Sequence, residues 1–232
     1  MLNIAAILSG GTGTRAEAGK PKQFVDLGGK PMILRTIDVF EESHDIDQII
    51  VVSHPDYIGK LETMRCEGGY RKWVRTIAGG AERYLSSYEA VKACAGLDGN
   101  LFIHDAARPF VTTELIGRLA EALRTAEAAV PVIPLSDTLV EVEGNCIKCV
   151  PERKKFRFVQ TPQVFRLPLL LKAFEAAFCN SNICVTDDCG LVLNYFPNAR
   201  IQYVEGDIFN KKLTYHSDIE SFNKLFVEKN KK

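Results

Sequence analysis

The chain has 232 residues, of which 46% are hydrophobic and 25% are charged. This length suits a single α/β domain over residues 1–232 with a sizeable core, and it is short for two full domains. Lysine plus arginine equals aspartate plus glutamate at 29 each, so no net charge would attract nucleic acid or an anionic membrane surface. The sequence holds no run of about 18 or more apolar residues, so we expect no membrane span.

Apolar strands and amphipathic helices alternate along most of the chain. We predict strands at residues 4–8, 48–53, 73–77, 100–104, 127–133 and 200–204. We predict helices at residues 31–43, 56–65, 82–95, 112–126, 168–178, 187–196 and 217–228. Thr112-Thr113-Glu114 and Ser217-Asp218 provide N-cap chemistry for two of these helices. The alternation is typical of a doubly wound, mostly parallel α/β sheet with helices on both faces.

The pattern changes between Asp137 and Phe165. Polar and apolar side chains alternate there with period two around Glu143-Gly144-Asn145, which predicts a β-hairpin. A two-stranded ribbon is only marginally stable alone and must pack against something. We therefore predict a protruding hairpin arm, at about residues 137–160, that joins two copies of the chain in a homodimer.

Seven cysteines are scattered along the chain, and no signal peptide is recognisable at the N-terminus. An odd and scattered set predicts reduced thiols in a cytoplasmic protein. Cys146 and Cys149 form the one C-x-x-C pair. No second pair or histidine cluster completes a zinc site, so we assign both cysteines to hairpin strands and leave any further role open.

A glycine-rich loop, Ser9-Gly10-Gly11-Thr12-Gly13, follows the first predicted strand. Backbone N–H groups in such a loop can approach a phosphate or a base closely. Arg15, Lys20 and Lys22 place positive charge beside it. The combination predicts a cradle for a nucleotide triphosphate, whereas a turn without a ligand would explain only the glycines.

Two better-known glycine loops fit this segment poorly. The loose dinucleotide pattern Gly11-x-Gly13-x-x-Ala16 is present, but Gly19-Lys20-Pro21 interrupts the segment before a crossover helix could form. The ATP P-loop pattern requires Ser or Thr after the lysine, where this chain has Pro21. Neither motif therefore accounts for the loop.

Ligands of open α/β sheets bind beyond the carboxyl ends of the strands, so polar residues that follow predicted strands are candidates. Gly79-Gly80-Ala81-Glu82-Arg83, with Ser86 one turn later, fits either a ligand loop or a plain turn with a helix cap. Asp105 follows the fourth strand, where it could hold Mg²⁺ against phosphates or pair structurally with Arg108.

Three later segments are also polar. Thr186-Asp187-Asp188 is explained by a helix N-cap and first turn. Gln160 to Gln163 indicates a rigid wall rather than a solvated loop. Lys211 and Lys212 follow the last predicted strand, from which a lysine could reach an α-phosphate.

Taken in order, these segments resemble the cytidylyltransferases that act on polyol phosphates, namely the 2-C-methyl-D-erythritol 4-phosphate and ribitol-5-phosphate enzymes. The resemblance covers nearly the whole chain. It rests on Ser9 to Arg15, Pro21 to Gln23, Gly79 to Arg83, His104 to Pro109, Asp137-Thr138, Arg153, Gln160 to Gln163, Thr186 to Asp188 and Asn210-x-Lys212-x-Thr214.

The resemblance implies a Rossmann-like fold with a dimer arm, and a reaction of CTP and Mg²⁺ with a polyol phosphate. Implied catalytic contacts to the triphosphate are Arg15, Lys22 and Lys212. Implied nucleotide contacts are Ser9, Gly10, Gly11, Thr12, Gly13, Gly80, Ser86 and Asp105, the last also beside Mg²⁺. Implied acceptor contacts are Thr138 and Arg153 from the partner's arm, together with Thr161.

The sequence favours 2-C-methyl-D-erythritol 4-phosphate as acceptor, with a CDP derivative and pyrophosphate as products. His104 to Pro109 and Thr186 to Asp188 fit that enzyme. The opening glycine loop and Cys189 fit the ribitol-phosphate enzyme, and Phe156-Arg157 stands where the methylerythritol enzymes usually carry Leu-Trp. Ribitol 5-phosphate is therefore the alternative acceptor, while another nucleotide or a non-catalytic nucleotide-binding relative stays open.

Overall fold

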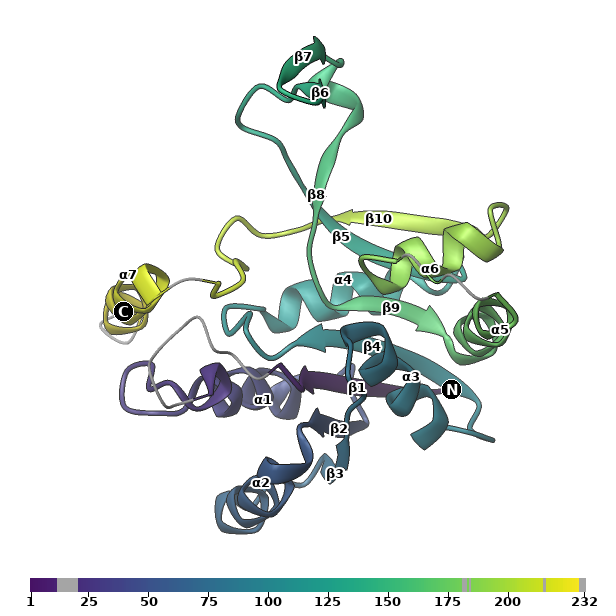
Figure 1. Ribbon diagram of the computed structural model, residues 1–232. Coiled ribbons are helices and arrows are strands. Elements are labelled where there is room, and N and C mark those ends of the chain that lie inside the picture. Colours follow the sequence, from purple (N-terminus) through teal and green to yellow (C-terminus); the bar gives the residue numbers. More distant parts are fainter. Residues whose placement is uncertain (12–20, 181–182, 184, 215, 230–232) are drawn as a thin grey trace.

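The computed structural model describes residues 1–11, 21–180, 183, 185–214 and 216–229. A central sheet carries helices on both faces, and a small hairpin projects from it (Figure 1). The strands are β1 (Leu2–Ser9), β2 (Gln48–Ser53), β3 (Trp73–Ala78), β4 (Gly99–Asp105), β5 (Ala128–Pro134), β6 (Glu141–Glu143), β7 (Cys146–Cys149), β8 (Arg157–Val159), β9 (Gln163–Arg166) and β10 (Ile201–Glu205). The helices are α1 (Met32–Glu42), α2 (Pro55–Gly68), α3 (Arg83–Ala93), α4 (Thr113–Ala122), α5 (Leu167–Phe178), α6 (Asp188–Tyr195) and α7 (His216–Lys229), with short 3₁₀ helices η1 (Lys22–Phe24) and η2 (Arg153–Lys155).

The main sheet has the order β10-β5-β9-β4-β1-β2-β3, and β8 pairs with β5. β1 pairs in parallel with β2 and β4, β2 with β3, and β5 with β10. β9 runs antiparallel to β4 and β5, and β8 runs antiparallel to β5. The predicted mostly parallel α/β sheet is confirmed. β8 and β9, at three and four residues, were not predicted because so short a run shows no periodicity.

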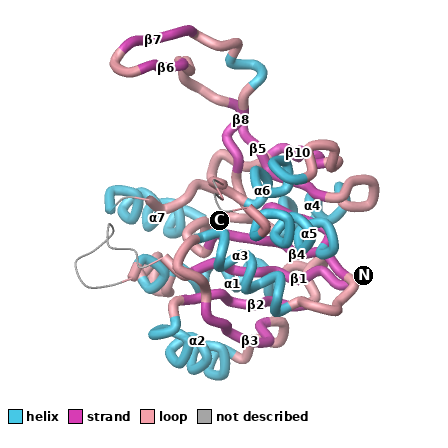
Figure 2. Tube along the Cα trace, turned by 45° about the vertical axis from the view of Figure 1, so that its right-hand side comes forward, coloured by secondary structure: helices cyan, strands magenta, loops and turns pink. Residues whose placement is uncertain are grey.

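Alternation along the strands builds two core layers. In β1, Ala5 and Ile7 face the layer formed with α1, α2 and α4, while Ile4, Ala6 and Leu8 face the layer formed with α3, α5 and α6. The tube in Figure 2 shows helices on both sides of the strands. Because both faces are covered there, β1, β2 and β4 are apolar in their middle, and their polar side chains lie near the strand ends.

The predicted helix starts are confirmed where the structure describes them. Thr112 caps α4 by accepting a hydrogen bond from Leu115 N at 3.2 Å. Asp187 caps α6 by accepting from Gly190 N at 2.8 Å. α7 begins at His216, and the side chain of Ser217 lies outside the described residues.

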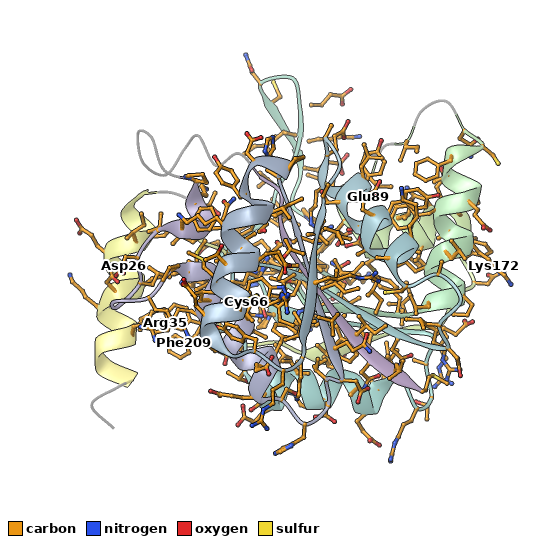
Figure 3. The ribbon with its side chains drawn as sticks, turned by 90° about the horizontal axis from the view of Figure 1, so that it is seen from below. Asp26, Arg35, Cys66, Glu89, Lys172 and Phe209 are labelled. Carbon is orange, nitrogen blue, oxygen red and sulfur yellow. The ribbon has the colours of Figure 1, made fainter. Side chains whose placement is uncertain are left out.

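A third apolar cluster attaches α7 to the body of the protein. Phe222 and Phe226 of α7 pack on Phe110, with ring centroids 4.9 and 4.4 Å apart. Arg35 lies over the Phe226 ring at 5.0 Å, and Figure 3 shows it beside this helix. Among the described helices none is long and apolar enough to cross a bilayer.

The predicted hairpin is confirmed. β6 and β7 pair antiparallel around Gly144, which adopts φ 59° as such a turn requires, and the hairpin stands away from the main sheet (Figure 1). Val142 and Ile147 oppose each other in the register and are 63% and 67% exposed. The arm therefore shows solvent an apolar face that contributes nothing to the core of its own chain.

Candidate active site

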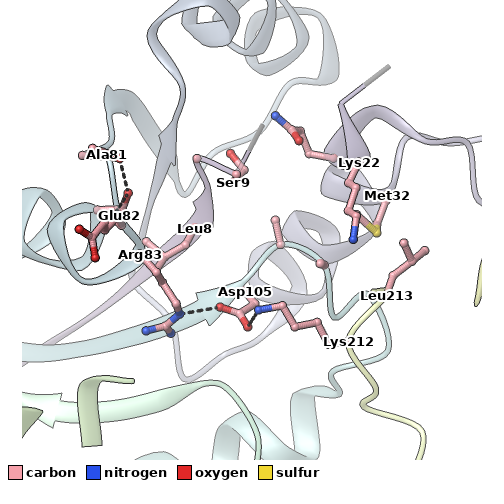
Figure 4. A pocket seen from close by; sticks show the side chains of 17 residues that line it. Leu8, Ser9, Lys22, Met32, Ala81, Glu82, Arg83, Asp105, Lys212 and Leu213 are labelled. Carbon is pink, nitrogen blue, oxygen red and sulfur yellow. Dashed lines mark hydrogen bonds and ion pairs between the residues drawn. The ribbon is translucent and has the colours of Figure 1, made fainter. Parts of the chain in front are cut away.

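A pocket of about 390 Å³ opens at the carboxyl ends of β1 and β4 (Figure 4). The loop after β3, the start of α3, η1 and the segment after β10 complete its wall. The sequence-predicted residues that line it are Ser9, Gly10, Gly11, Lys22, Gly80, Ser86, Asp105 and Lys212. The predicted contacts Thr12, Gly13 and Arg15 lie outside the described residues. Residues far apart in sequence thus meet where the topology predicts a ligand site.

The loop after β3 folds tightly against α3. A Cβ added to Gly79 would lie 2.7 Å from Ser86 Oγ, and one added to Gly80 would lie 2.3 Å from Leu85 Cβ. Ser86 is 4% exposed, and its hydroxyl donates to the carbonyls of Glu82 at 3.3 Å and Gly80 at 3.4 Å. Only glycine fits at these two positions, so this wall of the pocket is backbone.

Asp105, at the end of β4, is the centre of an ion-pair cluster. Arg83 Nε donates to its Oδ1 at 3.1 Å, and Lys212 Nζ donates to its Oδ2 at 2.8 Å (Figure 4). Arg108 Nε stands farther away, at 3.8 Å from Oδ2. The structural pairing with Arg108 that the sequence suggested is therefore the weakest of the three.

These charges decide the ionisation of Asp105. Burial alone would raise its pKa, but the cations Arg83 and Lys212 outweigh burial and hold the pKa well below its ordinary value. Burial would likewise lower the pKa of Arg83, but the carboxylates of Asp188 and Asp105 raise it. Both groups are therefore charged at neutral pH.

A chain of hydrogen bonds lies beneath Asp105. Its backbone N–H donates to Thr161 Oγ1 at 3.1 Å, which leaves the hydroxyl proton for His104 Nδ1 at 2.9 Å. His104 Nε2 then donates to Arg108 O at 3.1 Å. This pattern assigns the neutral Nε2–H tautomer to His104, and burial lowers its pKa to about 3.

Thr161 therefore lies lower in the site than the resemblance implied. It is 4% exposed, and its hydroxyl is occupied on both sides by Asp105 N and His104 Nδ1. In this arrangement Thr161 supports the floor of the pocket, and direct contact with an acceptor stays a prediction. Its position in the polar segment Gln160 to Gln163 gave no sign of this burial.

Buried amides fix the segment that carries Lys212. Asn210 is fully buried, and its Nδ2 donates to Thr161 O at 2.8 Å. Gln160 Nε2 donates to Asp207 O at 2.7 Å, and a Cβ on Gly206 would lie 2.4 Å from Gln160 Oε1. The segment just before Lys212 is thereby tied to the loop between β8 and β9. Its other end meets Lys22, whose Nζ donates to Thr214 O.

The two predicted arm residues lie apart from this pocket. Thr138 is exposed, and neither it nor Arg153 lines the cavity. Arg153 begins η2 and donates from Nη1 to Ser136 O at 2.6 Å across the base of the arm. Within one chain the structure therefore does not bring them to the other predicted site residues.

Residues 4–227 match the protein family described as 2-C-methyl-D-erythritol 4-phosphate cytidylyltransferase. The chain belongs to this family. The family member of Thermobifida fusca (strain YX) is 36% identical over 222 residues, covering 93% of this chain and 89% of that protein.

Two further relatives widen the comparison of this cytidylyltransferase. The bifunctional ribulose 5-phosphate reductase/CDP-ribitol pyrophosphorylase of Haemophilus influenzae is 37% identical over 228 residues, covering 97% of this chain and 48% of that protein. The crystal structure of 4-diphosphocytidyl-2C-methyl-D-erythritol synthase from Anaerococcus prevotii DSM 20548 superposes with a TM-score of 0.87 at 26% identity. It covers 97% of this chain and 96% of that one.

Two residues with carboxylate side chains, Glu82 and Asp105, line the pocket of this cytidylyltransferase. Within the described residues, no group of three or more His, Cys, Asp or Glu side chains could hold a metal by itself. Mg²⁺ is typically bound by one or two carboxylates with substrate phosphates and water. Asp105 therefore fits a Mg²⁺ site that is completed by a triphosphate.

Sequence reasoning missed two side chains of the ion-pair cluster in this cytidylyltransferase, Arg83 and Asp188. Arg83 belongs to a recognised segment but received no role, and Asp188 was explained by a helix N-terminus alone. In the structure Arg83 Nη1 donates to Asp188 Oδ2 at 2.7 Å, so the two join the Asp105 cluster. The sequence signal for Asp188 was its place beside Asp187 at a helix start. Its pairing with Arg83 joins residues 105 positions apart, so no local pattern shows it.

Proposed function

We propose that this chain transfers the cytidylyl group of CTP to a polyol phosphate, with 2-C-methyl-D-erythritol 4-phosphate as the favoured acceptor. The products are the CDP derivative of the polyol and pyrophosphate. The proposal rests on the pocket at the carboxyl edge of the sheet. Lys22, Asp105 and Lys212 line this pocket together with Gly10 and Gly11, the glycines that follow β1. Membership of the cytidylyltransferase family supports the same reaction.

The chemistry requires positioning more than proton transfer. A phosphate oxygen of the acceptor, already ionised at neutral pH, attacks the α-phosphorus of CTP and forms a new P–O bond. The bond from the α-phosphorus to the bridging oxygen breaks in line, and its electron pair leaves with pyrophosphate. No general base is needed, and His104 is buried and neutral, consistent with a purely structural role.

Positive charge is what the pocket supplies to this step. Lys22 and Lys212 lie on its wall and would neutralise negative charge on the α-phosphate and the leaving pyrophosphate. Arg15, outside the described residues, is assigned the same role by the resemblance. Removal of one such contact should lower the rate by about 10² or more, as for a lost oxyanion-hole donor.

Mg²⁺ is the metal we assign to the reaction. Asp105 would hold it together with phosphate oxygens of CTP, and the ion would supply further neutralisation of the triphosphate. In the present structure Asp105 Oδ2 is bound to Lys212 at 2.8 Å. In this arrangement Lys212 neutralises part of the Asp105 charge.

We assign the acceptor site to two chains of a cytoplasmic homodimer. The exposed apolar face of the arm, which includes Val142 and Ile147, supports association with a second copy. Thr138 and Arg153 would then reach the partner's pocket and hold the acceptor phosphate. The six described cysteines are free, which agrees with a reducing compartment.

Ribitol 5-phosphate is the second candidate acceptor. The CDP-ribitol pyrophosphorylase relative matches as well as the methylerythritol relatives, at 37% identity. Arg157 adds a cation at the base of the arm, where it donates to Lys154 O and Phe156 O at 2.8 Å. The methylerythritol enzymes usually have tryptophan at this position, so Arg157 departs from their pattern, while the opening glycine loop and Cys189 fit the ribitol-phosphate enzyme.

The experiment is pyrophosphate release from CTP with Mg²⁺ and each acceptor, alone and in equimolar competition. We expect release with 2-C-methyl-D-erythritol 4-phosphate and a preference for it in competition. Preference for ribitol 5-phosphate would transfer the proposal to the second candidate, and release with neither acceptor would refute the reaction. UTP, ATP and GTP in the same assay test the choice of nucleotide.

A further inference from the structure

The third apolar cluster, which attaches α7, also joins three segments that meet at the pocket. Val25 comes just after η1, Phe110 follows β4, and Leu213 follows β10. Each of these apolar side chains is at most 4% exposed, and Phe222 and Phe226 of α7 belong to the same cluster. One cluster therefore connects α7 to three of the segments that carry charged side chains of the pocket.

The wall of the pocket and the third apolar cluster share side chains. Met32, Ala107 and Leu213 line the pocket, and the same three belong to the cluster or pack against it. Met32 and Leu213 are at most 1% exposed, and Leu213 N donates to Ala107 O at 2.8 Å. Because buried side chains are close-packed, the packing of the cluster sets the position of this wall.

Residues 212–214 connect α7 to both lysines of the pocket wall. Lys212 is the first residue of this segment, and Thr214 is the last. Lys22 Nζ donates to Thr214 O, and Thr214 N donates to Asp218 Oδ2 in the first turn of α7 at 2.7 Å. A displacement of α7 therefore reaches both lysines through the backbone of one short segment.

α7 is attached separately from the two layers that cover the sheet. None of its described residues belongs to either layer, and the helix stands at the side of the molecule (Figure 1). An element held by few buried side chains opens at a lower free energy than the whole protein unfolds. α7 can therefore detach while the sheet and its two layers stay folded.

We propose that docking of α7 on the third apolar cluster is coupled to nucleotide binding. The docked helix holds residues 212–214, and with them Lys22 and Lys212, in the arrangement that binds the triphosphate. The inference rests on the proposed function, because it takes CTP as the ligand of the pocket. Such coupling is reciprocal: the factor by which docking raises the affinity for CTP is the factor by which CTP stabilises docking.

The first test is hydrogen exchange of the α7 amides with and without saturating CTP and Mg²⁺. None of the described residues of α7 lines the pocket, so direct shielding by the nucleotide does not account for protection there. We expect exchange in α7 to slow by about fivefold or more when CTP binds. α5 (Leu167–Phe178), which contributes no described residue to the pocket or the third cluster, is the reference, and its fast-exchanging amides should keep their rates.

Phe226→Ala tests the coupling in the other direction. Phe226 stacks on Phe110 with ring centroids 4.4 Å apart and does not line the pocket. Weaker docking should raise the Kd of CTP, measured by calorimetry without acceptor, by about fivefold or more. The matched control is Phe178→Ala, which removes a ring 4.6 Å from Tyr88 of α3 and should bind CTP as the wild type does.

Asn223→Ala carries the test if Phe226→Ala does not fold. Asn223 Oδ1 accepts from Gly28 N at 2.8 Å, which ties α7 to the segment after η1. Its loss should raise the Kd in the same direction by a smaller factor. Folded variants that bind CTP as tightly as the wild type, or α7 amides that CTP does not protect beyond those of α5, overturn the coupling. A wild type that binds no CTP refutes the proposed function, and the coupling with it.

Discussion

Thr161 connects the floor of the pocket to the core through a single hydroxyl. It accepts from Asp105 N at 3.1 Å and donates to His104 Nδ1 at 2.9 Å, and it is 4% exposed. Thr161→Val keeps the shape but leaves two buried polar atoms without a partner, which should lower the free energy of unfolding by about 1–3 kcal/mol.

The measurement for Thr161 is thermal or urea unfolding of the valine variant beside Thr161→Ser, which keeps the hydroxyl and should retain most of the stability. Equal stability of the valine variant and the wild type would contradict the hydrogen-bond chain. A change in acceptor KM with no change in stability would instead support the direct contact that the resemblance implied.

His104 should make the protein sensitive to mild acid. Burial lowers its pKa from 6.5 to about 3, so below pH 6.5 the unfolded chain binds a proton that the folded chain refuses. Stability is therefore complete above that pH and falls as the pH drops toward 3, at about 1.4 kcal/mol per unit of pKa difference. The lowered pKa of Asp105 adds a further loss of stability that begins as the pH falls through the ordinary aspartate pKa, 3.8.

The pH dependence is measured as the unfolding temperature of the wild type and of His104→Gln between about pH 7 and about pH 4, the range in which an unfolded histidine takes up its proton. The wild type should lose stability across this range, and the variant should show a flatter profile whatever its absolute stability. His44→Gln, at an exposed position, should behave as the wild type. Parallel profiles for all three proteins would show that His104 is not held neutral.

Among the elements, the hairpin arm formed by β6 and β7 contributes no side chain to the described core clusters. Val142 and Ile147 oppose each other on its exposed face. Substituting both with glutamate should convert a dimer to a monomer while the unfolding temperature of the main domain stays nearly constant. Glu143→Gln, on the same hairpin, serves as the control.

Sedimentation velocity at micromolar concentration measures whether the wild type and the double variant are dimers or monomers. A monomeric wild type, or a double variant that sediments as the wild type does, would contradict an arm-mediated dimer. The apolar contact is the only interaction that the substitutions remove, because neither side chain packs on the described core clusters.

The order and type of the elements could be predicted because their signals are local. The strand predicted at residues 4–8 is β1 (Leu2–Ser9), and the helix predicted at 112–126 is α4 (Thr113–Ala122), since periodicity and caps are read within a few residues. β8 and β9 escaped because they are short and antiparallel, and their place in the sheet is set by pairing with distant strands.

The candidate site was predictable in its residue types but less so in its pairings. Asp105 was recognised from its position after a strand, yet its partners Arg83 and Lys212 lie 22 and 107 positions away, and no local pattern connects them. Thr161 and Asn210 are buried where the segment after β10 packs on the loop between β8 and β9. Polar residues in a sequence show what chemistry is available, and the fold decides which of them meet.

At the scale of the whole molecule, a chain without net charge concentrates cations at one edge of its sheet. Arg83, Arg108 and Lys212 surround Asp105, and Lys22 lies on the same pocket wall. Thr138 and Arg153 of the arm, the predicted acceptor contacts, do not line this pocket. In the proposed homodimer, one chain would therefore contribute to two different sites. We therefore propose that turnover needs the pocket of one chain and the arm of another.

Complementation between two inactive variants tests that claim most directly. Lys212→Met damages only the pocket, and Arg153→Gln damages only the arm, so each homodimer should release pyrophosphate from CTP at about a hundredth of the wild-type rate or less. Co-expressed chains in equal amounts should recover about a quarter of the wild-type activity, because half of a random set of two-fold dimers are mixed and each mixed dimer has one intact site. Recovery to that level would confirm a site shared between chains. A mixture no more active than the separate variants would contradict it.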